Sequence, residues 1–246
     1  MPVDGPDHKL QQQGDDECPR NELRRAGGID DPRREIAPPG PARDRRRQHD
    51  AGQHDLSEHA GGRLTVISEN ALATNLAEIT PPPRRVIANL PYNIGTQLLI
   101  NWLEVSEAFL GFTLMFQKEV AERIVSSPGN KSYGRLSVLA RWLTKPRAMF
   151  DIPATAFVPP PNVTSSVINL EVRPEPLAPA RREDLELVTR AAFGQRRKML
   201  RRALSSIGGA EMLANANVPE DARAEDLSVE QFCAIARVLG DRELAR

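Results

Sequence analysis

The sequence predicts an α/β protein in which a mostly parallel sheet layered by helices precedes a small C-terminal all-helical domain. Short apolar runs alternate with amphipathic stretches over residues 63–175, and this alternation is typical of a parallel sheet covered by helices. Beyond the proline-rich stretch at 173–180 the strand pattern disappears, so residues 176–246 are expected to be helical. Residues 1–62 are rich in Arg, Asp, Pro, Gly and Gln and have no regular period, which predicts disorder.

The apolar periods place the individual elements, and proline and glycine separate them. For example, the triple proline at 81–83 ends a short helix-like stretch. Strands are predicted at 63–67, 85–89, 112–117, 147–152 and 165–172, the last two as an antiparallel-looking pair at the sheet edge. Helices are predicted within 68–79 and at 96–105, 118–125 and 133–143, and then at 182–193, 196–207, 209–216 and 228–239.

Composition excludes several classes of protein. The 246 residues contain 33 Lys and Arg against 33 Asp and Glu, so any cationic surface must be local. No apolar run is long enough to span a membrane, and the N-terminus lacks a secretory signal. Cys233 lies on an apolar stripe and Cys18 in a different segment, which favours a buried thiol over a disulfide or a metal ligand. We expect a cytoplasmic monomer without a metal ion.

The tetrapeptide Asn89-Leu90-Pro91-Tyr92 directly follows the predicted strand 85–89. Ligands of open α/β sheets bind beyond the carboxyl ends of the strands, so a site is expected here. Pro91 disfavours the helical conformation for Leu90 and so leaves its carbonyl projecting. The Asn89 amide oxygen and the Leu90 carbonyl would then form two adjacent hydrogen-bond acceptors.

Two adjacent acceptors match the two protons of an exocyclic aromatic amine. Hydrogen bonds from both protons favour a pyramidal nitrogen with a directed lone pair, and the acceptors stabilise the positive charge that develops on methylation. Tyr92 could stack on the ring of a base that has been flipped out of its helix. The same four residues are equally consistent with an ordinary turn at the end of a strand.

Six motifs, in order and spacing, resemble the small-subunit ribosomal RNA adenine N6,N6-dimethyltransferase family. They are NLPYNIGTQLL, MFQKEVAERIV, YGRLSVLARW, AFVPPPNVTSSV, AFGQRRKMLRRAL and LSVEQFCAIAR, within residues 63–237. The resemblance implies a Rossmann-like methyltransferase sheet and transfer of methyl groups from S-adenosylmethionine to two adjacent adenosines of 16S ribosomal RNA. It also implies that Asn89, Leu90, Pro91 and Tyr92 grip the amine, with Asn89 near the cofactor. Phe157 would be the second aromatic against the base, unless it is simply a core residue before the proline turn.

The sequence departs from the family pattern at the cofactor site. The glycine-rich turn of the family and the acid that holds the ribose are absent, and Asn70 stands where the family has an Asp toward the adenine of S-adenosylmethionine. An amide oxygen can accept the same hydrogen bond, so we expect impaired rather than abolished cofactor binding. Asn162 and Thr164 also replace the usual Lys and Asp. We hypothesise that residues 1–62 come from a different reading frame and replace the first part of the sheet.

The segment QRRKMLRR at 195–202 concentrates positive charge in an otherwise balanced chain. On a continuous helix, Arg197 and Lys198 would lie one turn before Arg201 and Arg202, opposite an apolar stripe. Such a cluster is either a solvated helix face or a contact for phosphates. With the neighbouring motifs we favour phosphate contact, and the predicted RNA-binding residues are Arg196, Arg197, Lys198 and Arg201. The predicted apolar stripe consists of Met199, Leu200, Ala203 and Leu204.

Three functions remain open at this point. The first is dimethylation of adenosines in 16S ribosomal RNA on the small ribosomal subunit. The second is an inactive RNA-binding protein of small-subunit assembly, because the glycine-rich cofactor loop is absent. The third is an N6-adenine DNA methyltransferase or a glutamine side-chain methyltransferase, since the same two acceptors would serve those amines.

Overall fold

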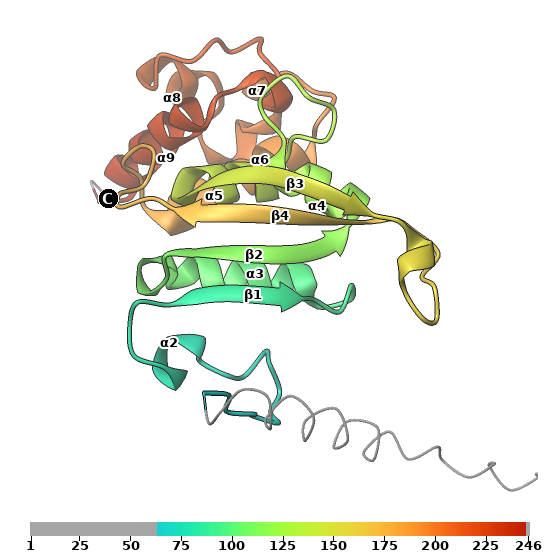
Figure 1. Cartoon of the computed structure of the whole chain (residues 1–246). Coiled ribbons are helices and arrows are strands. Elements are labelled where there is room, and N and C mark those ends of the chain that lie inside the picture. Colours follow the sequence, from blue (N-terminus) through green and yellow to red (C-terminus); the bar gives the residue numbers. More distant parts are fainter. Residues whose placement is uncertain (1–62, 245–246) are drawn as a thin grey trace, which may run out of the picture. The chain divides into compact units, whose positions relative to one another are not determined.

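A computed structural model describes residues 63–244, and from Ile67 onward these residues belong to one compact unit. The predicted disorder and frame change in residues 1–62, like Cys18, lie outside the described residues. Four strands form one sheet in the order β1-β2-β4-β3 (Figure 1). Their bounds are β1 (Arg85–Asn89), β2 (Gly111–Gln117), β3 (Thr144–Ile152) and β4 (Ser165–Val172).

Strand directions in the sheet are mixed. β1 and β2 are parallel, whereas β4 is antiparallel to both β2 and β3. The prediction of a mostly parallel sheet is therefore wrong for the described strands, and the antiparallel pair at the edge is confirmed. The reason is the connection: β3 returns to β4 without a crossover helix, which parallel pairing would require. The carboxyl ends of β1, β2 and β3 and the start of β4 consequently meet at one end of the sheet.

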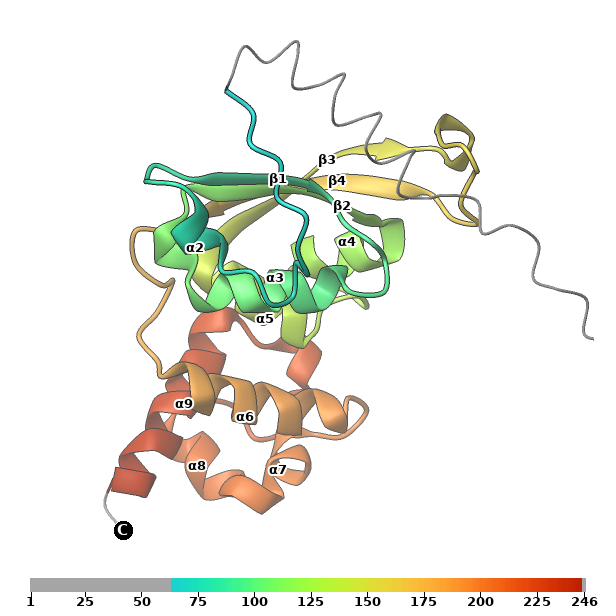
Figure 2. The ribbon, with the colours of Figure 1, turned by 90° about the horizontal axis from the view of Figure 1, so that it is seen from below.

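Helices cover one face of this sheet, as Figure 2 shows. α3 turns Leu98, Leu99 and Leu103 into the core, and the ring of Trp102 stacks on Phe112 of β2 with centroids 6.2 Å apart. This apolar spacing is the one that predicted the helix. The helices of this layer are α2 (Leu76–Ile79), α3 (Gly95–Glu104), α4 (Lys118–Val125) and α5 (Arg135–Leu143), with the short 3₁₀ helix η1 (Ser106–Ala108). A further 3₁₀ helix, η2 (Ala154–Ala156), lies in the connection between β3 and β4.

Two predicted strands differ from the structure. Residues 63–67 form no strand, and Leu64 and Val66 are 41% and 45% exposed. None of the described strands pairs with this segment, and apolar composition alone does not make a strand without paired backbone hydrogen bonds. β3 begins at Thr144 and includes Pro146, earlier than predicted. It lies at the sheet edge, where a strand tolerates proline because one side of the ladder is unpaired.

The residues that follow β4 are helical, in agreement with the prediction. The bounds are α6 (Arg182–Gly194), α7 (Leu200–Ala203), α8 (Gly209–Asn215) and α9 (Val229–Leu244), with η3 (Ser205–Ile207) and η4 (Ala224–Asp226). Cys233 on α9 is fully buried, as predicted. Burial raises the pKa of its thiol to about 12.

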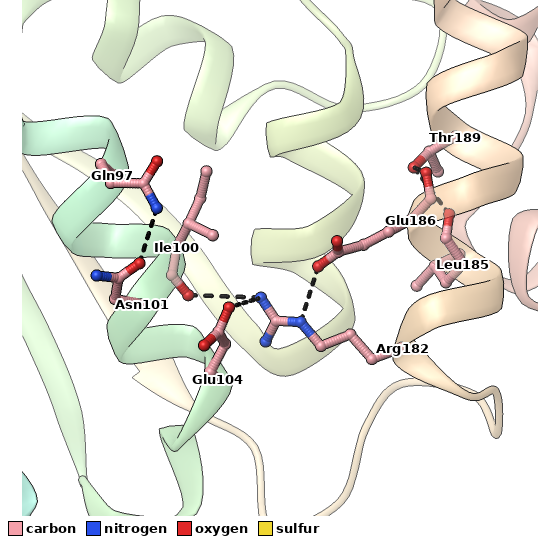
Figure 3. A network of polar contacts seen from close by, with 8 residues as sticks. All are labelled: Gln97, Ile100, Asn101, Glu104, Arg182, Leu185, Glu186 and Thr189. Carbon is pink, nitrogen blue, oxygen red and sulfur yellow. Dashed lines mark hydrogen bonds and ion pairs between the residues drawn. The ribbon is translucent and has the colours of Figure 1, made fainter.

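A polar network joins α6 to α3 (Figure 3). Arg182 on α6 lies 3.5 Å from the Glu104 carboxylate and donates to the Ile100 carbonyl at 3.4 Å. It also pairs with Glu186 one turn along α6 at 2.8 Å. Buried residues of the sheet layer and of the later helices form one continuous apolar cluster. The helical part is therefore packed onto the sheet part by both apolar and ionic contacts.

Candidate active site

A cavity of about 320 Å³ opens at the end of the sheet where β1 and β2 finish. All four residues of the predicted tetrapeptide and Phe157 line it, although Phe157 comes from the distant connection between β3 and β4. The complete lining consists of Asn89, Leu90, Pro91, Tyr92, Met115, Phe157, Pro159 and Pro161. The structure thus brings together the tetrapeptide and the motif around Phe157. From the sequence, only the resemblance to a family had connected these two motifs.

The turn after β1 is fixed by its own backbone. The Pro91 carbonyl accepts hydrogen bonds from the Ile94 and Gly95 amides at 3.2 and 2.9 Å and so starts α3. Gly95 packs tightly here: an added Cβ would lie 3.1 Å from the Phe116 ring and 3.2 Å from the Leu90 Cβ. The glycine therefore lets α3 begin directly against the turn. The helix uses the Pro91 carbonyl and not that of Leu90, as the proline argument required.

The two predicted acceptors differ in burial. Asn89 is exposed and pairs with Met115 in the β1–β2 ladder. No residue within 63–244 forms a hydrogen bond with its side-chain amide, so that group is free for a ligand. Leu90 is only 5% exposed, so its side chain anchors the turn in the core. The Asn89 amide is thus accessible at the cavity beside a buried anchor, and the acceptor role of the Leu90 carbonyl stays a prediction.

Tyr92 and Phe157 provide the two aromatic surfaces of the cavity. The Tyr92 hydroxyl lies 2.6 Å from the Ser165 hydroxyl at the start of β4. Neither ring stacks on another aromatic ring of the part of the chain that the structure describes. Pro159 and Pro161 stiffen the segment that follows Phe157. The cavity has apolar walls and a polar amide at its edge, which suits a planar heteroaromatic ring.

A second polar group at this end of the sheet has no counterpart in the sequence predictions. Asp151 of β3 pairs with Lys118 of α4 at 2.7 Å and accepts from Ser166 at 2.5 Å. The hydrogen bonds from Lys118 and Ser166 lower the pKa of Asp151, and the hydrogen bond to Asp151 raises the pKa of Lys118. These contacts tie β3, β4 and α4 together. They depend on cross-strand register, which no local sequence pattern reveals.

Asn70 is not among the residues that line the cavity. Its side-chain oxygen accepts from the Leu72 amide at 3.1 Å, and its carbonyl accepts from the Ala73 amide at 2.9 Å. The oxygen that was expected to receive the cofactor's amine thus accepts one hydrogen bond within a local turn. The predicted role of Asn70 stays a prediction.

The basic segment does not form the predicted continuous helix. α6 ends at Gly194, a turn follows, and α7 covers only Leu200–Ala203. Glycine at the end of α6 and the β-bridge of Met199 with Arg223 interrupt the helical pattern. The one-turn spacing between Arg197 and Arg201 is therefore wrong. Met199 is 43% exposed and leaves the predicted apolar stripe, whereas Leu200, Ala203 and Leu204 are buried.

The basic side chains of this segment fall into two groups. Arg196 pairs with Glu225 at 2.9 Å and donates to the Lys131 carbonyl at 2.5 Å, and Arg201 pairs with Glu220 at 3.1 Å. Arg197 and Lys198 have no ion-pair partner within residues 63–244. Arg196 also lines a cleft of about 730 Å³, together with Lys131 and Arg135. Two of the four predicted cations are therefore already engaged by the protein.

The fold and this site define a class: an α/β protein of Rossmann-like methyltransferase architecture with a ring-sized cavity at the strand ends. Two solved structures share the fold. One is a dimethyladenosine transferase from Plasmodium falciparum, with a TM-score of 0.64 and 21% identity over 80% of each chain. The other is the 23S rRNA methyltransferase ErmE, with a TM-score of 0.54 and 22% identity over 76% of this chain and 77% of that one.

Sequence similarity gives the family. A family model described as "Ribosomal RNA adenine dimethylase" matches residues 46–241. The chain belongs to the ribosomal RNA adenine dimethylase family, as the motifs predicted, and the match begins upstream of the expected boundary at residue 63. Two relatives are named ribosomal RNA small subunit methyltransferase A. The protein of Paramagnetospirillum magneticum is 51% identical over 193 residues, and that of Rhodospirillum rubrum 55% over 179 residues.

These alignments cover 78% and 72% of this chain, and 69% and 62% of the relatives. About a third of each relative thus has no counterpart in the aligned part of this chain. No group of His, Cys, Asp and Glu among residues 63–244 could hold a metal ion. In the same range, no helix is both long and apolar enough to cross a membrane.

Proposed function

We propose that this chain binds adenosines of small-subunit ribosomal RNA and presents their N6 amines for methylation. The observation that supports this most is the single cavity lined by Asn89, Leu90, Pro91, Tyr92 and Phe157. A flipped purine would lie between the Tyr92 and Phe157 rings, since base–aromatic stacking holds extruded bases in many enzymes. We also propose that the chain acts in the cytoplasm as a monomer.

In this proposal, the protein contributes to the reaction by orienting the N6 amine of the adenosine. The Asn89 oxygen and the Leu90 carbonyl would each accept one N6 proton, which directs the nitrogen lone pair out of the ring plane. Stacking fixes the ring so that the nitrogen faces the methyl donor at a reproducible angle. No side chain has to act as a base, because the methylated nitrogen loses its proton to water.

S-adenosylmethionine is the methyl donor that the family implies, and it would supply an electrophilic methyl group when bound. The described residues fit it only in part. The Asn89 amide is suited to a contact beside the reacting end, whereas the Asn70 oxygen accepts a hydrogen bond from Leu72 and does not line the cavity. Residues 63–244 contain no glycine-rich turn after a strand that could cradle the methionine end. We therefore propose weakened cofactor binding by this chain.

The helical residues 176–246 are proposed to be the RNA-binding domain, with residues 63–175 as the partial methyltransferase domain. Arg197 and Lys198 are the proposed phosphate contacts, because they have no ion-pair partner among the described residues. Arg196 and Arg201 are proposed to support that surface through Glu225 and Glu220. Phosphate contacts of this kind position RNA without reading its sequence.

Transfer of a radiolabelled methyl group from S-adenosylmethionine to small ribosomal subunits tests the proposal. Asn89→Ala should abolish labelling of N6-methylated adenosine, because one of the two amine acceptors is lost. Asn93→Ala is the matched control, since Asn93 is an exposed amide on the same turn and does not line the cavity. Equal labelling by the parent chain and Asn89→Ala would contradict the proposed site.

A second candidate is an RNA-binding protein of small-subunit assembly without methyltransferase activity. The missing glycine-rich turn among residues 63–244 favours it. Calorimetric titration with S-adenosylmethionine distinguishes the two: binding supports the enzyme, and RNA binding without cofactor binding supports the second candidate.

A further inference from the structure

Ser165 connects Tyr92 at the cavity to the sheet. It begins β4, is fully buried, and pairs with Gln117 of β2 on one side and Ile152 of β3 on the other. Its hydroxyl lies 2.6 Å from that of Tyr92, which belongs to the irregular turn after β1. From this contact we infer that Ser165 is a positioning residue that holds the Tyr92 ring in its stacking orientation.

The geometry explains what this hydrogen bond can do. Tyr92 is 36% exposed and lies in a turn, so packing alone leaves its ring loosely held. The phenol oxygen lies on the axis about which the ring rotates. A hydrogen bond there does not stop ring flips, but it fixes the direction of the axis by holding the ring at both ends. The ring of Tyr92 is then held at the cavity before any ligand arrives.

The segment that contains Phe157 also ends at this serine. Residues 153–164 connect β3 to β4, contain Phe157, and return to the sheet at Ser165. Both aromatic residues of the cavity are thus connected to Ser165. Tyr92 is connected through its hydroxyl, and Phe157 through the backbone of the segment that leads to β4. Ser165 would therefore set the gap between the walls, and a preset gap lowers the entropic cost of inserting a planar base.

The neighbouring serine offers a matched control. Ser166 is also buried, at 4% exposure, and its hydroxyl also forms one short hydrogen bond, which it donates to Asp151. Ser165→Ala and Ser166→Ala therefore each remove one hydroxyl from the start of β4. Only Ser165→Ala removes the contact with Tyr92. A general weakening of the sheet would affect both variants alike.

The test follows the tyrosine rings by NMR in the full chain. The chain contains only two tyrosines, Tyr92 and Tyr133, so carbon-13 labelling of tyrosine rings gives two assignable sets of signals. Without RNA, Ser165→Ala should shift the Tyr92 signals and leave those of Tyr133 in place, and Ser166→Ala should change neither. Unchanged Tyr92 signals in Ser165→Ala would overturn the inference.

The consequence for ligand binding rests on the proposed function and is measured separately. Adding a short adenine-containing single-stranded RNA should shift the Tyr92 signals of the parent through stacking. Ser165→Ala should bind this RNA about two- to tenfold more weakly, the range for loss of one hydrogen bond. Ser165→Thr, which keeps a hydroxyl, should restore binding. Equal affinity of the parent and Ser165→Ala would contradict positioning.

Tyr92→Phe removes the same contact from the other side and leaves the buried serine in place. It should weaken RNA binding to the same extent as Ser165→Ala, and the double variant should be no weaker than either single one. Additive losses would overturn the inference. If the parent's Tyr92 signals do not respond to RNA, the proposed function fails, while the comparison without RNA still decides whether Ser165 holds the ring.

Discussion

The residues of the tetrapeptide have separate tasks because their environments differ. Leu90 is buried in the core, whereas Asn89 and Tyr92 are exposed at the cavity. Pro91 lies between Leu90 and Tyr92, and its carbonyl accepts the hydrogen bonds that start α3. A buried apolar anchor between two accessible functional side chains keeps the latter in place without filling the cavity.

The contribution of a single cation of the basic segment can be measured by substitution. Arg197→Glu should weaken RNA binding about tenfold and lower the slope of log affinity against log salt by about 1, because a phosphate contact is lost. Filter binding at several salt concentrations measures both quantities. Arg147→Glu, the same charge change on the exposed strand β3, is the control. An unchanged salt slope in Arg197→Glu would exclude this residue from the RNA contact.

At the scale of elements, the sequence predicted those that depend on local period. α3 has four large apolar residues at helical spacing, and β4 matches its predicted bounds of 165–172. The wrong predictions concern elements whose structure depends on contacts with residues far away in the sequence. Residues 63–67 lack a neighbouring strand among the described residues, Pro146 is tolerated because β3 is an edge strand, and the helix predicted at 196–207 is interrupted by a bridge to Arg223. Period alone contains no information about such partners.

The start of α3 provides a test at this scale. Gly95→Val should lower the free energy of unfolding by about 1 to 3 kcal/mol, because the added side chain meets Phe116 and Leu90 in a packed region. Gly194→Val is the matched control, since an added Cβ at the end of α6 meets nothing within 4 Å. Urea denaturation of both variants measures the difference. Equal stability of Gly95→Val and Gly194→Val would show that the turn does not need close packing.

At the scale of the whole molecule, the site is assembled from parts that are far apart in sequence. The amide and one ring follow β1, the second ring lies between β3 and β4, and the serine that holds Tyr92 begins β4. The sequence predicted Asn89, Leu90, Pro91, Tyr92 and Phe157, the last only by resemblance to a family. It did not predict Ser165 or Met115, because their role depends on strand order and register.

The central claim is that the end of β1 grips a purine through its amine. Affinities should be compared for two short RNAs that differ at one base, adenine in one and unsubstituted purine, which lacks the amine, in the other. The parent chain should bind the adenine RNA about tenfold more tightly, the effect of two hydrogen bonds, and Asn89→Ala should lose most of this preference. Equal affinity of the parent chain for both RNAs would contradict the claim.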